Sequence, residues 1–214
     1  MKSFRLFLPL VTAILLTPSV AAADRIDMND PRRVVGREND VRVDAQLLHD
    51  TVSPGSPVGV VYQVQNFTSE PIAIAGKLAT ASYDKDSATI TLSVGAEIPP
   101  DGRMPHMEII APGEKRILNV GATPSLTVDA THPRFGAAPR YVQVKVSFLR
   151  DVQPFATVID QQNARGGAQF PDELFDRWFE AQDTIFLNVV PVRFSPRARG
   201  ADASIGARAD ASRM

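Results

Sequence analysis

The stretch that decides the fold class of this chain is YVQVKVSFL, residues 141–149. Apolar side chains occupy every second position from Val142 to Phe148, and three polar residues lie between them. Successive side chains of a β-strand point to opposite faces of a sheet. The alternation therefore predicts a strand with one face in a core and the other toward solvent.

The same two-residue period recurs on both sides of this stretch. Upstream, it predicts strands over residues 41–47, 58–66, 71–83, 88–94, 107–110 and 115–120. Downstream, residues 184–194 are apolar at most positions, which is typical of a strand covered on both faces. Turns rich in Pro and Gly, such as residues 53–57 and Pro112-Gly113, separate the strands. This rhythm predicts an all-β fold, an antiparallel β-sandwich.

The connection between the last two predicted strands is 34 residues long, residues 150–183. Connections of this length in compact domains usually contain structure or carry function. Its second half predicts one short helix at about residues 170–182. Pro171 suits a first helical turn, and Asp172 and Glu173 favour the positive end of the helix dipole. We therefore expect a helical insertion before the last strand.

The N-terminus has the three parts of a secretory signal peptide. Lys2 and Arg5 give a basic start, residues 6–16 are apolar, and Ala21 and Ala23 provide small residues before a cleavage site. The apolar run is too short to span a membrane. The sequence predicts cleavage after Ala23 and a periplasmic or secreted protein without a transmembrane segment in its mature chain.

The rest of the chain is expected to form three parts. Residues 24–40 are a polar lead, and residues 41–194 are the sandwich domain with its helical insertion. Residues 195–214 form a tail of Ala, Arg, Gly, Ser, Asp and a few other residues. Because the tail has no hydrophobic periodicity, we expect it to be disordered.

Composition excludes several classes of function. The chain has no cysteine, which excludes disulfides, thiolate metal sites and a lipid-carrying cysteine after the signal. Loss of Lys2 and Arg5 with the signal changes the formal net charge from −1 to −3, so nucleic acid is not an expected partner. The 3 histidines lie in turn-like settings without a Gly-x-Ser-x-Gly element. We expect no catalytic residues, no enzymatic activity and no cofactor.

Several local motifs resemble those of bacterial secreted immunoglobulin-like domains. They are the Val-x-Val-x-Ala of residues 41–45, a strand ending in Asn66, the Ala-Pro-Gly-Glu turn of residues 111–114, and the strand that begins at Tyr141. Its Tyr-x-Val-x-Val pattern is similar to the penultimate strand of fibronectin type III-like sandwiches, in which the tyrosine hydroxyl can brace a corner. The resemblance implies an immunoglobulin-like β-sandwich and a habit of binding rather than a reaction.

One cluster of soft ligands offers an alternative function. Met104, His106 and Met107 lie within four positions, and thioethers with an imidazole are ligands that copper(I) prefers. A surface histidine beside two packed methionines explains the same pattern. The alternative interpretation is a periplasmic copper-handling protein that uses these three residues.

The predicted helix carries the candidate partner-binding residues, Leu174, Phe175, Trp178 and Phe179. Buried Trp and Phe side chains concentrate binding energy at protein interfaces. They also serve as core residues, so the helix either caps one end or edge of the sandwich or presents a contact surface. We favour the cap because large exposed apolar patches are uncommon. The leading hypothesis is an exported non-catalytic binding or assembly module, whose partner is another exported protein or envelope component. If Trp178 is buried, we expect the contact surface of the module at an open strand edge instead.

Overall fold

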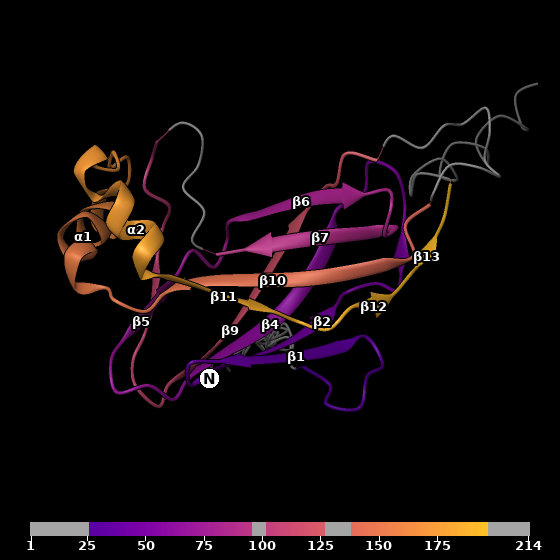
Figure 1. Ribbon diagram of the computed structural model, residues 1–214, viewed down its shortest axis with the longest axis horizontal. Helices are drawn as coiled ribbons and strands as arrows, with labels where there is room; N and C mark the ends of the chain where they lie inside the picture. Colours follow the sequence, from indigo (N-terminus) through magenta and orange to yellow (C-terminus); the bar gives the residue numbers. More distant parts are fainter. Residues whose placement is uncertain (1–25, 96–101, 127–137, 197–214) are drawn as a thin grey trace, which may run out of the picture.

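The computed structural model describes residues 26–95, 102–126 and 138–196 (Figure 1). The predicted signal peptide, residues 1–23, lies outside these ranges, as does the predicted tail beyond residue 196. Ser195, at the start of that tail, donates a backbone hydrogen bond of 2.8 Å to the Val52 carbonyl. The chain is mostly β-strand, arranged in two principal sheets that face each other across one core.

The first sheet has four strands in the order β1-β2-β4-β9, all antiparallel. Their bounds are Arg33–Glu38 for β1, Val41–Leu47 for β2, Val58–Asn66 for β4 and Lys115–Ala122 for β9. The strands predicted at residues 41–47 and 58–66 are confirmed. The inward residues of β2 and β4 are fully buried, as the alternation requires.

The second sheet has β10 (Tyr141–Leu149) at its centre. One edge of β10 pairs with β7 and, at its end, with β5; the other edge pairs with β11 and β12. β6 pairs with β7, and β8 pairs with β5. The bounds are Ile72–Ile74 for β5, Ala79–Asp84 for β6, Thr89–Val94 for β7, Glu108–Ile110 for β8, Gln182–Phe186 for β11 and Val190–Pro191 for β12.

Two pairings depart from the antiparallel prediction. β7 and β10 are parallel over six residue pairs, and β3 (Thr51–Val52) is parallel to β13 (Arg193–Phe194). Parallel neighbours need a crossover connection. Here the chain leaves β7, contributes β9 to the first sheet, and returns as β10 in its original direction. An alternating pattern contains no information about strand direction.

Three predicted boundaries are corrected by the structure. The strand predicted over residues 71–83 breaks into β5 and β6, because a turn closed by the Leu78 amide and the Ala75 carbonyl (3.0 Å) lies between them. The strand predicted over residues 184–194 breaks into β11, β12 and β13. The polar lead contains β1, which forms a two-residue hairpin with β2. Asn39 and Asp40 at its tip have φ of 46° and 58°, the left-handed values that such hairpins need.

The long connection contains two α-helices where the sequence predicts one. α2 (Phe175–Ala181) follows a short 3₁₀ turn, η2 (Asp172–Leu174), and confirms the helix predicted at about residues 170–182. The additional helix is α1 (Ala156–Arg165), which follows η1 (Gln153–Phe155). α1 buries only Val158 and Ile159, a stripe too narrow to stand out in the sequence. Both helices lie together at one end of the sheets (Figure 1).

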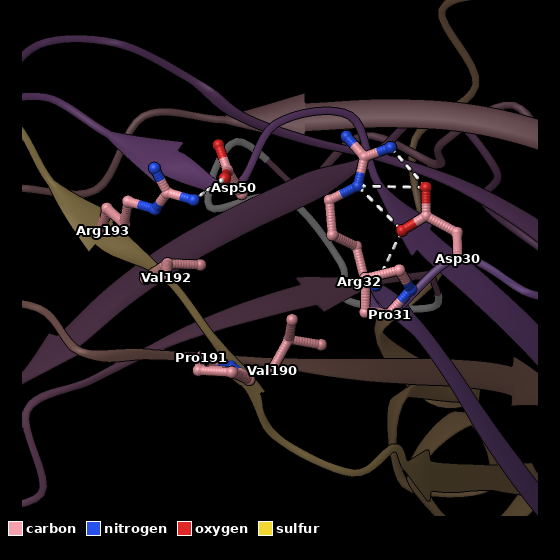
Figure 2. A pocket seen from close by; sticks show the side chains of 8 residues that line it. All are labelled: Asp30, Pro31, Arg32, Asp50, Val190, Pro191, Val192 and Arg193. Atoms are coloured by element: carbon pink, nitrogen blue, oxygen red, sulfur yellow. Dashed lines mark hydrogen bonds and ion pairs between the residues drawn. The ribbon is translucent and has the colours of Figure 1, made fainter.

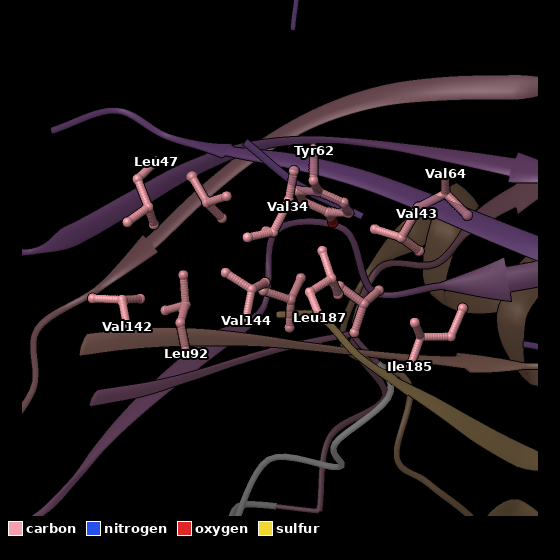
Figure 3. Close-up of a cluster of buried hydrophobic side chains, with 14 of the residues drawn as sticks. Val34, Val43, Leu47, Tyr62, Val64, Leu92, Val142, Val144, Ile185 and Leu187 are labelled. Atoms are coloured by element: carbon pink, nitrogen blue, oxygen red, sulfur yellow. The ribbon is translucent and has the colours of Figure 1, made fainter. Parts of the chain in front are cut away.

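Two hydrophobic cores hold these layers together. The main core lies between the sheets and joins side chains such as Val43 and Tyr62 of the first sheet to Leu92 and Val144 of the second (Figure 3). The second core lies beneath the helices. It is formed by buried side chains of residues 73–75, 104–107, 149–159 and 168–181, namely Ala73, Ala75, Met104, Met107, Leu149, Val152, Phe155, Val158, Ile159, Ala168, Phe170, Trp178 and Ala181.

The tyrosine that joins the sheets is not the one that the resemblance indicates. Tyr141 is 41% exposed at the start of β10. Tyr62 is instead fully buried in β4, and its hydroxyl donates a hydrogen bond of 2.9 Å to the Gly76 carbonyl in the turn after β5. This hydrogen bond fixes the end of the second sheet against the first.

Candidate functional site

The predicted partner-binding residues divide between the second core and the surface. Trp178 is fully buried, with its ring centroid 5.2 Å from that of Phe155 and 5.1 Å from that of Phe170 in edge-on contacts. Leu174 is partly buried against the same core. Helix α2 therefore contributes Trp178 to a cap over one end of the two sheets.

Phe175 and Phe179 remain on the surface of α2. They are 46% and 58% exposed, and their rings pack against each other with centroids 4.8 Å apart. Without its central tryptophan, this pair lacks the large buried anchor that concentrates binding energy at an interface. An open strand edge is therefore the better candidate for the contact surface.

The three residues of the copper alternative do not share one environment. Met104 and Met107 are each 1% exposed and lie in the second core with Phe155 and Trp178. The His106 side chain is 51% exposed, and its Nε2 lies 3.7 Å from Glu108 Oε1. Within residues 26–95, 102–126 and 138–196, no three His, Cys, Asp or Glu side chains gather closely enough to hold a metal ion. Apolar packing accounts for both methionines.

A pocket of 630 Å³ opens between the start of β1 and the strands β12 and β13 (Figure 2). Its charged groups are already paired. Arg32 contacts both carboxylate oxygens of Asp30 and donates a further bond of 3.1 Å to the Leu48 carbonyl. Arg193 lies 3.3 Å from Asp50. The hydrogen bonds from Arg32 lower the pKa of Asp30 to about 2, so this carboxylate stays charged and paired at neutral pH.

Strand β9 forms an open edge of the first sheet. Among the described residues it pairs only with β4, and the amide of Asn66 donates to the Glu114 carbonyl at 3.0 Å. Antiparallel hydrogen bonding alternates along a strand, so even-numbered residues of β9 bond to β4. The backbone N–H and C=O groups of its odd-numbered residues therefore point away from the sheet; these residues are Lys115, Ile117, Asn119 and Gly121.

The outer face of the same sheet has a second pocket, of 480 Å³, beside this edge. It is lined by Ile26, Met28, Arg42, Asp44, Gln63, Gln65, Lys115 and Ile117. Ile117 is 44% exposed although it lies in the middle of an edge strand. Lys115 and Ile117 therefore belong both to the open edge and to the pocket. We take the odd-numbered residues of β9 and this pocket together as the candidate site, and call it the β9 edge site.

The other long edge strands, β1 and β6, are shorter than β9. The open edge of β1 is shorter, and the amide of Arg33 at its start is bonded to the Asp30 carbonyl at 3.0 Å. β6, at the edge of the second sheet, has six residues, whereas β9 has eight. Among these edges, β9 has the longest row of outward backbone groups.

The sequence did not identify the β9 edge site. The alternation of residues 115–120 predicts the strand, and the structure confirms it with β9. Its position at an edge depends on which strands pair, and the sequence pattern does not contain that information. One signal was present, because Ile117 interrupts a run of exposed polar residues on the outer face.

Comparison with known proteins gives no relative from which function is transferred. No protein-family model, curated protein or solved structure matches the chain. None of the helices in the described ranges is long and apolar enough to cross a membrane.

Proposed function

We propose that this protein is an exported, non-catalytic binding module that accepts an extended segment of another exported protein or envelope component onto the edge of β9. The proposal combines the predicted immunoglobulin-like scaffold and the predicted secretory signal with one structural observation. That observation is the row of outward backbone groups on β9 beside an exposed Ile117. A strand added there continues the sheet and gains main-chain hydrogen bonds, which is a general mode of peptide recognition.

The side chains at this edge favour selective pairing. Exposed strand edges invite aggregation, and proteins protect them with charged residues, above all lysine. Lys115 and Arg116 are both exposed at the start of β9, and Arg116 forms an ion pair of 2.7 Å with Glu114. Positive charge at one end discourages parallel stacking of like edges, while the rest of the strand stays open for a partner.

A proline substitution tests the edge directly. Asn119 directs its N–H away from the sheet, so Asn119→Pro removes an outward donor without removing a bond to β4. Asn119→Ala keeps the donor and is the matched control. Val35→Pro makes the equivalent change on the open edge of β1 and controls for the effect of proline in an edge strand.

The probe is a random nine-residue peptide library displayed on phage and selected on the protein without residues 1–23. We expect selected peptides whose affinity falls at least about tenfold in Asn119→Pro and stays within about twofold in both controls, since tenfold corresponds to about 1.4 kcal/mol. Circular dichroism checks that each variant is folded. If the selection gives no peptide that depends on this edge, the proposal is wrong.

A further inference from the structure

We infer that the segment accepted by β9 carries an acidic side chain and an aliphatic side chain two positions apart on its outer face. This inference rests on the proposed function and specifies the partner's chemistry. It rests on two rows of side chains that run across β2 and β4 of the first sheet and end at β9.

The first row is basic at both ends. Strand register places Arg42 opposite Gln65, and Gln65 opposite Lys115. Neighbouring strands lie about 4.8 Å apart, so Arg42 and Lys115 are about 10 Å apart across the sheet. Among the described residues, Lys115 makes no ion pair and the Gln65 amide has no hydrogen-bond partner. The row thus presents an unneutralised ammonium group at the open edge.

The second row ends in an apolar side chain. Asp44 lies opposite Gln63, and Gln63 lies opposite Ile117. Ile117 is 44% exposed, and Met28, which lines the same pocket, is 57% exposed. An aliphatic side chain on an added strand would cover Ile117 and remove apolar surface from water.

The buried carboxylate of Asp44 does not neutralise this face. Its side chain is 5% exposed and is shared by Arg33 and by Arg42, whose Nε lies 2.8 Å from Asp44 Oδ2. The single negative charge of Asp44 thus neutralises the charge of only one of these two arginines. With Lys115, the side chains that line the pocket carry more positive than negative charge, whereas the chain without its signal has a formal charge of −3. Charge complementarity therefore selects a partner with a carboxylate here.

The spacing of the two rows sets the spacing on the partner. Lys115 and Ile117 are two residues apart and point to the same face of the sheet. A strand that pairs with β9 places its own same-face side chains two residues apart opposite them. The expected motif is acidic-x-aliphatic for a parallel partner and aliphatic-x-acidic for an antiparallel one.

The sequences of the edge-dependent peptides test this motif. We expect Asp or Glu two positions from Val, Ile or Leu in most of them. In one such peptide, replacing the acidic residue by Gln or Asn should weaken binding about three- to tenfold. Lys115→Glu should cause a similar loss, and a peptide with Lys at the acidic position should recover binding to Lys115→Glu. Lys85→Glu, an exposed charge reversal in the turn between β6 and β7, is the matched control and should change nothing.

The outcomes separate the inference from the proposed function. Edge-dependent peptides without the motif, or with equal binding to the wild type and Lys115→Glu, would overturn the inference and leave the edge proposal standing. Absence of any peptide sensitive to Asn119→Pro would overturn both. The motif together with the charge-swap recovery supports the inference.

Discussion

The hydroxyl of Tyr62 donates a hydrogen bond of 2.9 Å to the carbonyl oxygen of Gly76 and so connects β4 of the first sheet to the turn between β5 and β6. Burial raises the pKa of Tyr62 well above its ordinary range, so the hydroxyl keeps its proton in neutral and moderately alkaline solution. This contact lies in a largely apolar core, and the buried Asn66 side chain makes a second such contact, from β4 to the Ile110 carbonyl of β8 at 3.0 Å. Removal of the Tyr62 hydroxyl would leave the Gly76 carbonyl without this donor.

Tyr62→Phe should lower the free energy of unfolding by about 1–3 kcal/mol, because the ring still fills the core while the Gly76 carbonyl loses its donor. Urea denaturation measures the change. Tyr141→Phe removes a hydroxyl from a side chain that is 41% exposed and should change stability by less than about 0.5 kcal/mol. Equal effects of the two substitutions would mean that the Tyr62 hydrogen bond does not connect the sheets.

Gly95→Ala should destabilise the protein by at least about 4 kcal/mol or prevent folding. Gly95 has φ of 116°, and a Cβ there would lie 1.8 Å from the Ser147 carbonyl oxygen of β10. Gly55→Ala is the matched control: φ is 69° and nothing lies within 4 Å, so only the backbone conformation costs energy, about 1 kcal/mol. Soluble yield and thermal melting compare the two. A Gly95→Ala protein as stable as Gly55→Ala would contradict the close approach to β10.

Trp178→Ala should cost about 3–5 kcal/mol, because it leaves a cavity in the second core between Phe155 and Phe170. Trp178 is the 1 tryptophan of the chain, so its emission reports this core alone. The emission of the wild type should be blue-shifted and resistant to quenching by iodide. Phe179→Ala removes a side chain that is 58% exposed and should cost far less. Red-shifted emission in the folded protein would show that α2 does not form the cap.

The ion pair of Asp30 should make a pH-dependent contribution to stability. Its pKa is about 2 in the folded protein, below the ordinary value of 3.8, because of hydrogen bonds from Arg32. A lowered pKa stabilises the folded state above the ordinary value, and this contribution is lost as pH falls from about 4 to about 2. The difference in melting temperature between the wild type and Asp30→Asn should therefore shrink over this range. A difference that is unchanged down to pH 2 would contradict the role of the ion pair.

The fold was predictable wherever one side of a strand is buried. β2, β4, β7, β9 and β10 follow from the alternation of apolar residues, because solvent and core lie on opposite faces. The polar lead gives no sequence signal for β1, because only Val34 of that strand is buried and no apolar alternation results. The parallel pairing of β7 with β10 depends on the route of the chain between the sheets. Local patterns do not report that route.

The candidate site was less predictable than the fold. Aromatic residues at helical spacing mark an amphipathic helix, but Trp178 faces the second core and Phe179 faces solvent. The neighbouring methionines of the soft-ligand cluster fill the same core. The β9 edge site consists of backbone N–H and C=O groups that are left unpaired by the sheet. Such groups are common to nearly all residue types, so they leave no signal in the sequence. Only the order of strands in the sheet shows which backbone groups are left open.

Amide hydrogen exchange of β9, resolved by residue with NMR, tests the edge proposal most directly. In the free protein, the amides of Lys115, Ile117, Asn119 and Gly121 should exchange rapidly, and those of Arg116, Leu118 and Val120 should be protected by bonds to β4. Addition of a selected peptide should slow exchange at the odd-numbered positions and leave the even-numbered ones as they were. Protection of the odd-numbered amides in the free protein, or no change on peptide binding, would contradict the proposal that β9 accepts an added strand.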